Sequence, residues 1–259
     1  MFLTVLAFAL SAQTSSAPPA LDPVGEWGVE RRVHACTAKR SFGRDGVSLE
    51  YLPSELGLPG GRFVLLTPGK GPTTPQTFES EITGTSGALI RIEVSAGQSR
   101  LPNSRVVSFR STPEIVALFV GADTLSIPAS RDEHVQLRSP ELSSAMPGIA
   151  SCIDEIHDSY GIAKEQIART GKGPRFDNAV EWFRPESFPP LPAVQGRVTA
   201  LIAVSVEGKP ASCRIVNNTA HDDHGAFMCA RLMERGRFAA ATDLEGQPIQ
   251  SWTTMSINF

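Results

Sequence analysis

Short apolar runs, rich in β-branched and aromatic side chains, recur from residue 26 to about residue 137 and predict β-strands. Turn residues separate them, and one run, for example, is followed by Thr67-Pro68-Gly69. Runs of this length and spacing are typical of an antiparallel sandwich or barrel. The clearest predicted strands are residues 62–66, 89–94, 105–109 and 114–120.

A helical pattern follows these predicted strands. Pro140 stands directly after a serine, and proline is common at the first position of a helix. Ile149, Cys152 and Ile156 then recur at helical spacing. We therefore expect residues 22–161 to form a mostly antiparallel β domain that ends in a helix.

The following segment, residues 162–181, is polar and contains two glycines and a proline, which predicts a linker. After it, a predicted strand begins at Gly196, with Val198, Ala200, Ile202, Val204 and Val206 at its alternate positions, and residues 207–209 form a predicted tight turn. A second alternating stretch follows this turn. The two stretches predict a β-hairpin with one buried face.

A helix and a last strand complete the C-terminal region. Asp222 or Asp223 is expected to cap the helix, because carboxylates accept hydrogen bonds from free N–H groups at a helix start. The predicted apolar face of this helix contains Ala226, Cys229, Ala230 and Met233. Residues 252–259 alternate again. The expected fold class is therefore α+β, in which the N-terminal β domain is followed by a small β-β-α-β domain over residues 182–259.

Charge excludes one class of partner. The 259 residues carry 24 Lys and Arg against 27 Asp and Glu, a formal net charge of -3, and no basic run or stripe stands out. We therefore expect no nucleic-acid partner. The 22 Gly and 20 Pro residues imply many turns, which agrees with a β-rich chain.

The N-terminus resembles a secretory signal peptide. Residues 2–10 are largely apolar, and small and polar residues follow, with a cleavage point after Ala12 or Ala17. Nine helical residues would span about 14 Å, less than half of a hydrocarbon core of about 30 Å. We therefore expect a signal peptide over residues 1–17 and no membrane span after its removal. If the segment is not cleaved, it would instead anchor the protein to a membrane.

The cysteines agree with export to an oxidising compartment. No two of the four form a C-x-x-C pair, so redox motifs and zinc ribbons lack their usual spacing. Three pairings are open. Proximity favours a disulfide between Cys213 and Cys229, which leaves Cys36 and Cys152 for the other. The alternative is four buried free thiols.

One local cluster has chemical potential, His221-Asp222-Asp223-His224. Two imidazoles and two carboxylates could bind zinc, but consecutive residues at a helix start point in different directions and no H-E-x-x-H spacing is present. Helix capping with exposed histidines is the favoured interpretation. The isolated His34, His134 and His157 are expected to be surface or hydrogen-bonded structural residues. We therefore expect no catalytic residues, no metal and no cofactor.

The C-terminal region resembles the C-terminal domain of the TonB energy-transducer family. The matching features are Phe188-Pro189-Pro190, Gly196-Arg197-Val198, Glu207-Gly208-Lys209, Cys213-Arg214-Ile215-Val216, the helix that contains Cys229, Arg237-Phe238, and Asp243-Leu244-Glu245-Gly246-Gln247-Pro248. The resemblance covers residues 182–259 and implies a periplasmic binding module rather than an enzyme.

The resemblance also implies how such a module binds. In that family the C-terminal domain pairs with a short segment of an outer-membrane transporter by strand addition to a sheet edge. The expected edge strand consists of Trp252, Thr253, Thr254, Met255, Ser256, Ile257, Asn258 and Phe259. The expected function is therefore protein binding linked to energy-dependent transport. The alternatives are an exported scaffold or ligand-binding protein without energy coupling, and an edge covered by the neighbouring domain or by a second copy in a homodimer.

Overall fold

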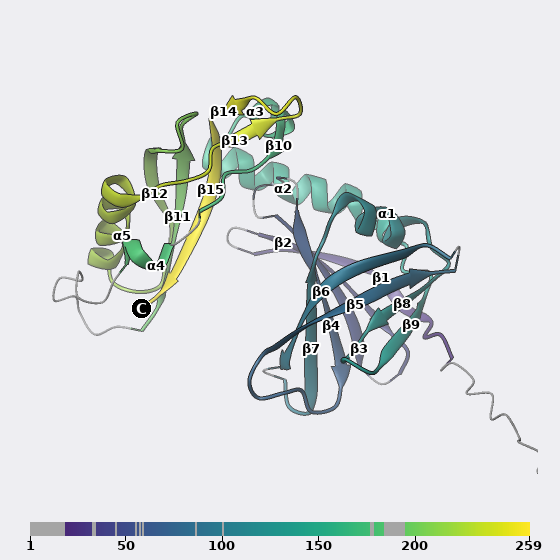
Figure 1. Cartoon of the computed structure of the whole chain (residues 1–259). Coiled ribbons are helices and arrows are strands. Elements are labelled where there is room, and N and C mark those ends of the chain that lie inside the picture. Colours follow the sequence, from purple (N-terminus) through teal and green to yellow (C-terminus); the bar gives the residue numbers. More distant parts are fainter. Residues whose placement is uncertain are drawn as a thin grey trace, which may run out of the picture.

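A computed structural model gives the structure of the chain (Figure 1). It describes residues 19–32, 35–44, 46–54, 56, 58, 60–85, 87–99, 101–176, 179–183 and 195–259. The expected signal peptide lies outside the described residues. Within them, no helix is both long and apolar enough to cross a membrane.

Nine antiparallel strands form the large sheet of the N-terminal part, in the order β1-β2-β3-β4-β7-β6-β5-β8-β9. A parallel bridge between Leu21 and Leu137 links the residues before β1 to β9, so the sheet is a nearly closed barrel. The Leu21 amide donates to the Gln136 carbonyl over 2.8 Å. The strands are β1 (Pro23–Arg31), β2 (Cys36–Phe42), β3 (Val47–Pro53), β4 (Gly61–Pro68), β5 (Gln76–Gly84), β6 (Leu89–Gln98), β7 (Ser104–Arg110), β8 (Thr124–Pro128) and β9 (His134–Arg138).

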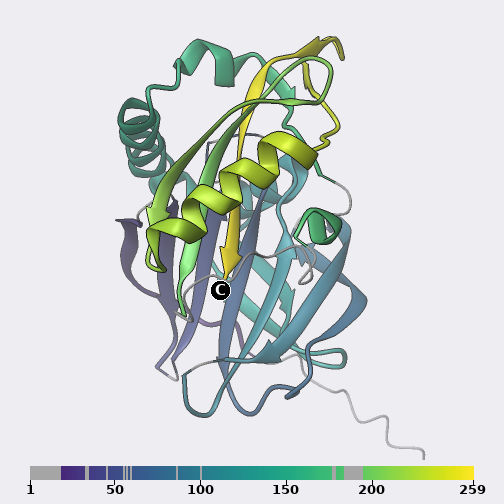
Figure 2. The same cartoon turned by 90° about the vertical axis from the view of Figure 1, so that its left-hand side faces the viewer.

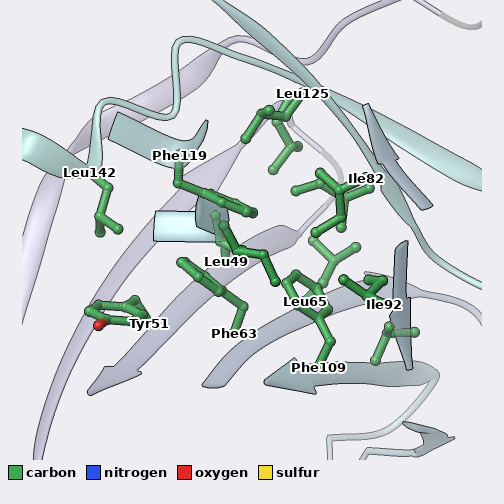
Figure 3. Close-up of a cluster of buried hydrophobic side chains, with 14 of the residues drawn as sticks. Leu49, Tyr51, Phe63, Leu65, Ile82, Ile92, Phe109, Phe119, Leu125 and Leu142 are labelled. Atoms are coloured by element: carbon green, nitrogen blue, oxygen red, sulfur yellow. The ribbon is translucent and has the colours of Figure 1, made fainter. Parts of the chain in front are cut away.

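Side chains fill the interior of this barrel (Figure 3). The ring of Phe63 lies at the centre of an aromatic group, with its centroid 4.1 Å from that of Phe119, 4.8 Å from Tyr51 and 5.6 Å from Phe109. Buried Leu, Ile and Val side chains surround these rings. The interior is therefore a packed core that holds the strands in register.

The prediction of a strand at residues 114–120 is wrong, because α1 (Pro113–Gly121) occupies this stretch. The hydroxyl of Thr112 accepts a hydrogen bond from the Ile115 amide, and Pro113 stands at the start of the helix. These are helix-start signals. Ile115 and Phe119 point into the barrel core. An apolar run of this length suits either structure, and here the cap decides.

The predicted helix that ends before residue 161 is confirmed, but its predicted start at Pro140 is wrong, because Ser139 and Pro140 lie outside any helix. A short 3-10 turn, η1 (Leu142–Ser144), leads into α2 (Met146–Tyr160). Gly161 ends the helix with a φ of 62°, in the left-handed region that favours glycine. A disulfide between Cys152 of α2 and Cys36 of β2 ties the helix to the barrel.

The C-terminal part contains two three-stranded sheets. The first has the order β12-β11-β15, and the second has the order β10-β13-β14. The helices and strands of the C-terminal part are α3 (Lys164–Ala168), β10 (Thr170–Lys172), α4 (Ala179–Trp182), β11 (Arg197–Val204), β12 (Pro210–Asn218), α5 (Asp222–Arg235), β13 (Ala241–Asp243), β14 (Pro248–Ile249) and β15 (Ser251–Asn258).

The expected fold class is therefore wrong, and the protein has a mostly β fold. The nearly closed nine-stranded sheet is the largest of the three sheets, and few of the described residues are helical. The C-terminal region is also more than a β-β-α-β unit, because β13 and β14 stand between α5 and β15. β13 pairs with β10, which comes from the segment expected to be a linker. Ile162 and Ile167 of that segment are buried.

Candidate functional site

Strand β15 lies at the edge of the C-terminal sheet and contains seven of the eight residues expected to bind a partner, with Phe259 directly after it. It pairs antiparallel with β11 from Arg197↔Asn258 to Val204↔Ser251. In the described part of the chain, no other strand pairs with it. Strand β12 occupies the other side of β11, so β15 has one paired edge and one outer edge.

The direction in which each backbone N–H and C=O group of β15 points follows from the residue pair just beyond the C-terminal end of the strand. Phe259 and Gly196 exchange both backbone hydrogen bonds, at 2.8 and 3.2 Å. In an antiparallel ladder such pairs alternate with pairs whose N–H and C=O groups point away from the partner strand. The backbone groups of Ile257 and Met255 therefore point toward β11, whereas those of Ser256 and Asn258 point to the outer edge.

Helix α5 covers one face of this sheet, and Figure 2 shows it lying across the sheet with the barrel behind. Met228 and Leu232 of α5 are buried against Ala200 and Met255 of the sheet. The predicted apolar face of the helix is wrong, because Ala226, Ala230 and Met233 are exposed and only Cys229 is half-buried. A shift of one residue turns a helical side chain by about 100°, and packing against the sheet selects the face.

The opposite face of the sheet packs on the barrel side of the molecule. Leu201 of β11 is 1% exposed and lies in a cluster with the Cys36–Cys152 disulfide. The other buried members of the cluster are Leu56, Ile156, Ile162 and Ile167. Both faces of the sheet are therefore occupied at this level, and the outer edge of β15 is the side to which Ser256 and Asn258 direct their backbone groups.

Polar contacts surround this packed face. Two of them join the sheet to α2 and α3, and a third joins these two helices to each other. The guanidinium of Arg214 on β12 donates to the Tyr160 carbonyl at the end of α2. The indole N–H of Trp252 donates to the Gln166 side chain over 3.4 Å. The ammonium of Lys164 lies 3.0 Å from an Asp154 oxygen, and this carboxylate raises the pKa of Lys164 above its ordinary value.

Side chains also fix the end of β15 from within its own sheet. The hydroxyls of Ser256 and Thr199 lie 2.8 Å apart, and the Asn258 side chain accepts a hydrogen bond of 3.1 Å from Arg197. The Phe259 ring lies 4.6 Å, centroid to centroid, from the ring of His224 on α5. The strand is therefore held in place before any partner binds.

Two disulfides are present, Cys36–Cys152 and Cys213–Cys229, and no cysteine is free. The pairing favoured by proximity is confirmed, and the alternative of four free thiols is wrong. The second bond joins β12 to α5 and so fixes the helix on the sheet. Disulfides of this kind fit an extracellular or periplasmic location.

The segment around α5 corrects two predictions. The helix cap is His221, whose Nδ1 accepts from the Asp223 amide over 3.3 Å, and neither aspartate is the capping residue. His224 is buried, not exposed, at 3%. Among the described residues, no three His, Cys, Asp or Glu side chains are grouped so that they could hold a metal ion.

The other histidines separate by environment. His157 is buried, and its Nε2 lies 2.8 Å from the Leu56 carbonyl, while His134 is exposed. His157 is thus a hydrogen-bonded structural residue, as predicted. His34 lies outside the described residues.

Comparisons with protein-family models, with curated proteins and with solved structures found no match to this chain.

Proposed function

We propose that this protein is an exported binding module of the periplasm that captures an extended segment of a partner protein by strand addition at β15. The observation that carries the proposal is the outer edge of β15, where the backbone groups of Ser256 and Asn258 point away from β11. An unpaired strand edge offers hydrogen bonds to another chain. The two disulfides support the exported location.

The proposed partner is the N-terminal segment of an outer-membrane transporter, as the resemblance to the TonB family implies. Backbone pairing would supply affinity, while the alternating side chains of the partner segment, packed beside the edge of the sheet, would supply selectivity. Through such a contact the protein would take part in energy-dependent transport. The rigid support of β15 favours this role, because a pre-ordered strand loses little conformational freedom on binding.

Two alternative functions remain, one that uses the outer edge of β15 and one that does not. A second copy could pair through its own β15 in an antiparallel homodimer, which the eight residues of the strand would allow. Alternatively, the protein could act as an envelope scaffold or ligand-binding protein without energy coupling. The experiment below separates these roles from the proposed one.

The test uses a proline at the outer edge of β15. Ser256→Pro removes an outward N–H and leaves the ladder to β11 without a missing donor. Ser256→Ala is the matched control, because it removes the hydroxyl contact with Thr199 and keeps the N–H. Synthetic peptides with the N-terminal segments of outer-membrane transporters from the same cell are titrated by calorimetry into each protein.

We expect peptide binding to the native protein and to Ser256→Ala, and a loss of at least about tenfold in affinity for Ser256→Pro, since one or more backbone hydrogen bonds are lost. Equal affinity for the proline variant would overturn strand addition at this edge. Absence of peptide binding together with a concentration-dependent dimer, disrupted only by the proline, would favour the homodimer.

A further inference from the structure

A cleft of about 580 Å³ lies between the outer face of the barrel and the start of β11. It goes beyond the function proposed above, and it adjoins β15 only through Arg197, which donates to the Asn258 side chain. Its walls carry the side chains of Arg62 on β4, Arg110 on β7 and Arg197 on β11, together with Arg32 between β1 and β2. Segments far apart in the sequence therefore bring four guanidinium groups into one concave surface.

Charge in this cleft is unbalanced. All four arginines are exposed, and the only carboxylate among the residues that line the cleft is that of Glu93. In the described part of the chain, Arg32, Arg62 and Arg110 have no ion pair. By contrast, Arg31 and Arg138 lie 3.0 and 2.7 Å from carboxylate oxygens.

The strand register of the barrel places two of these arginines where their repulsion lowers the stability of the folded protein without a ligand. Arg62 and Arg110 are direct partners in the antiparallel pairing of β4 with β7. Like charges opposite each other on neighbouring strands destabilise a sheet. An anion bound between the two guanidinium groups would remove this repulsion, so the pair is suited to a ligand.

A second observation points to the same place. The Thr37 side chain lines the cleft, is only 2% exposed, and has a hydroxyl without a hydrogen-bond partner among the described residues. Buried hydroxyl groups are normally hydrogen-bonded. The free hydroxyl of Thr37 can donate to an oxygen of a bound ligand. Ser95 and Ser108, register partners on β6 and β7, add two further hydroxyl groups to the wall.

We propose that this cleft binds a small ligand with at least two oxyanionic groups, either carboxylates or phosphates. The guanidinium group has a planar fork of donors that matches both kinds of oxyanion. Arginines from opposite walls favour a ligand with more than one such group. The volume lies within the range of small-molecule sites.

The test is calorimetric titration of the full-length protein at low ionic strength in a phosphate-free buffer, with citrate as the carboxylate probe and pyrophosphate as the phosphate probe. We expect one of them to bind, with an affinity that falls as salt is added. Arg62→Gln and Arg110→Gln should each weaken binding at least about tenfold, because each removes charge-assisted hydrogen bonds. Arg91→Gln is the matched control, since Arg91 is an exposed arginine of the barrel that pairs with Glu81 outside the cleft.

The thermal stability of two ligand-free variants separates a ligand-binding role of these residues from a structural one. Arg62→Gln should raise the Tm of the free protein, since it relieves the repulsion from Arg110. Thr37→Val should leave the free protein at least as stable and weaken ligand binding. Failure of both probes to bind at millimolar concentration, or equal weakening by Arg91→Gln, would overturn the proposal. A lower Tm for Arg62→Gln would assign the arginines a structural role instead.

Discussion

Cys36 of β2 and Cys152 of α2 form a disulfide at the place where the barrel meets the C-terminal sheet. Both cysteines are buried, and Leu201 of β11 belongs to the same cluster. The bond therefore fixes α2 on the barrel and also supports the surface on which the C-terminal sheet packs. The position of β15 depends on this junction.

Removal of this disulfide is expected to destabilise the protein more than removal of the other one. The cysteines are 116 residues apart in one bond and 16 in the other. On the chain-entropy model, the long loop contributes about 4–5 kcal/mol and the short loop about 3 kcal/mol. Urea unfolding of the Cys36→Ser/Cys152→Ser and Cys213→Ser/Cys229→Ser double variants measures the difference. An equal loss of free energy of unfolding in both would contradict the loop-length argument.

Replacement of Gly161 is expected to destabilise the protein because of the positive backbone φ at this position, and not because of contacts with neighbouring residues. Its φ is 62°, and nothing lies within 4 Å of an added Cβ. Gly161→Ala should therefore cost about 1 kcal/mol of stability, from left-handed strain alone. Gly121→Ala at the end of α1 is the control, since that site is equally open without a left-handed φ. It should be neutral or stabilising by about 0.5 kcal/mol in the same thermal unfolding assay.

Phe119 is expected to be essential to the barrel core. It is fully buried, and its ring stacks on Phe63 at 4.1 Å between centroids. Phe119→Ala should lower the free energy of unfolding by about 3–5 kcal/mol, since it removes buried apolar area and leaves a cavity. Val120, the next residue, is 40% exposed, and Val120→Ala should change stability by less than about 1 kcal/mol. Denaturant titration of both variants measures the two losses, and an equally small loss for Phe119→Ala would contradict its place in the barrel core.

Stability should decrease at high pH through Tyr51. Burial raises the pKa of this phenol above its usual range, and a hydrogen bond with Ser111 opposes the shift only partly. The folded protein thus keeps a proton that the unfolded chain loses near pH 10. The stabilising contribution of Tyr51 is complete below about pH 10 and is lost as pH rises through the folded-state pKa.

Chemical unfolding across this pH range, with Tyr51→Phe as the comparison, tests the effect. The native protein should lose stability more steeply with pH than the variant. Parallel pH profiles for the two proteins would show that Tyr51 makes no contribution.

Several local features were predictable from the amino-acid sequence alone. The hairpin turn at Glu207-Gly208-Lys209 is present, with Gly208 at a φ of 74° and the Ser205 amide bonded to the Lys209 carbonyl. The end of α2 at Gly161 and the pairing of Cys213 with Cys229 were also predictable. These features depend on backbone preferences and distances within a few residues, which a local pattern records.

The sheet order, the fold class and the grouping of the arginines depend instead on contacts between residues far apart in the chain. Residues 114–120 have an apolar pattern that suits a strand or a helix. The helix start at Thr112 and Pro113 is a local signal, whereas the packing of Phe119 inside the barrel depends on residues far away in the chain. β10 pairs with β13 about 70 residues later, although its own three residues carry no strand pattern.

Arg32, Arg62, Arg110 and Arg197 are unremarkable as single positions in the sequence. Their meeting in one cleft follows from the placement of β4 beside β7 and of β11 beside the barrel. Such placement is set by the packing of side chains far apart in the chain, which hydrophobic periodicity does not encode. The local pattern therefore predicted most individual elements, and long-range packing decided which of their outward side chains act together.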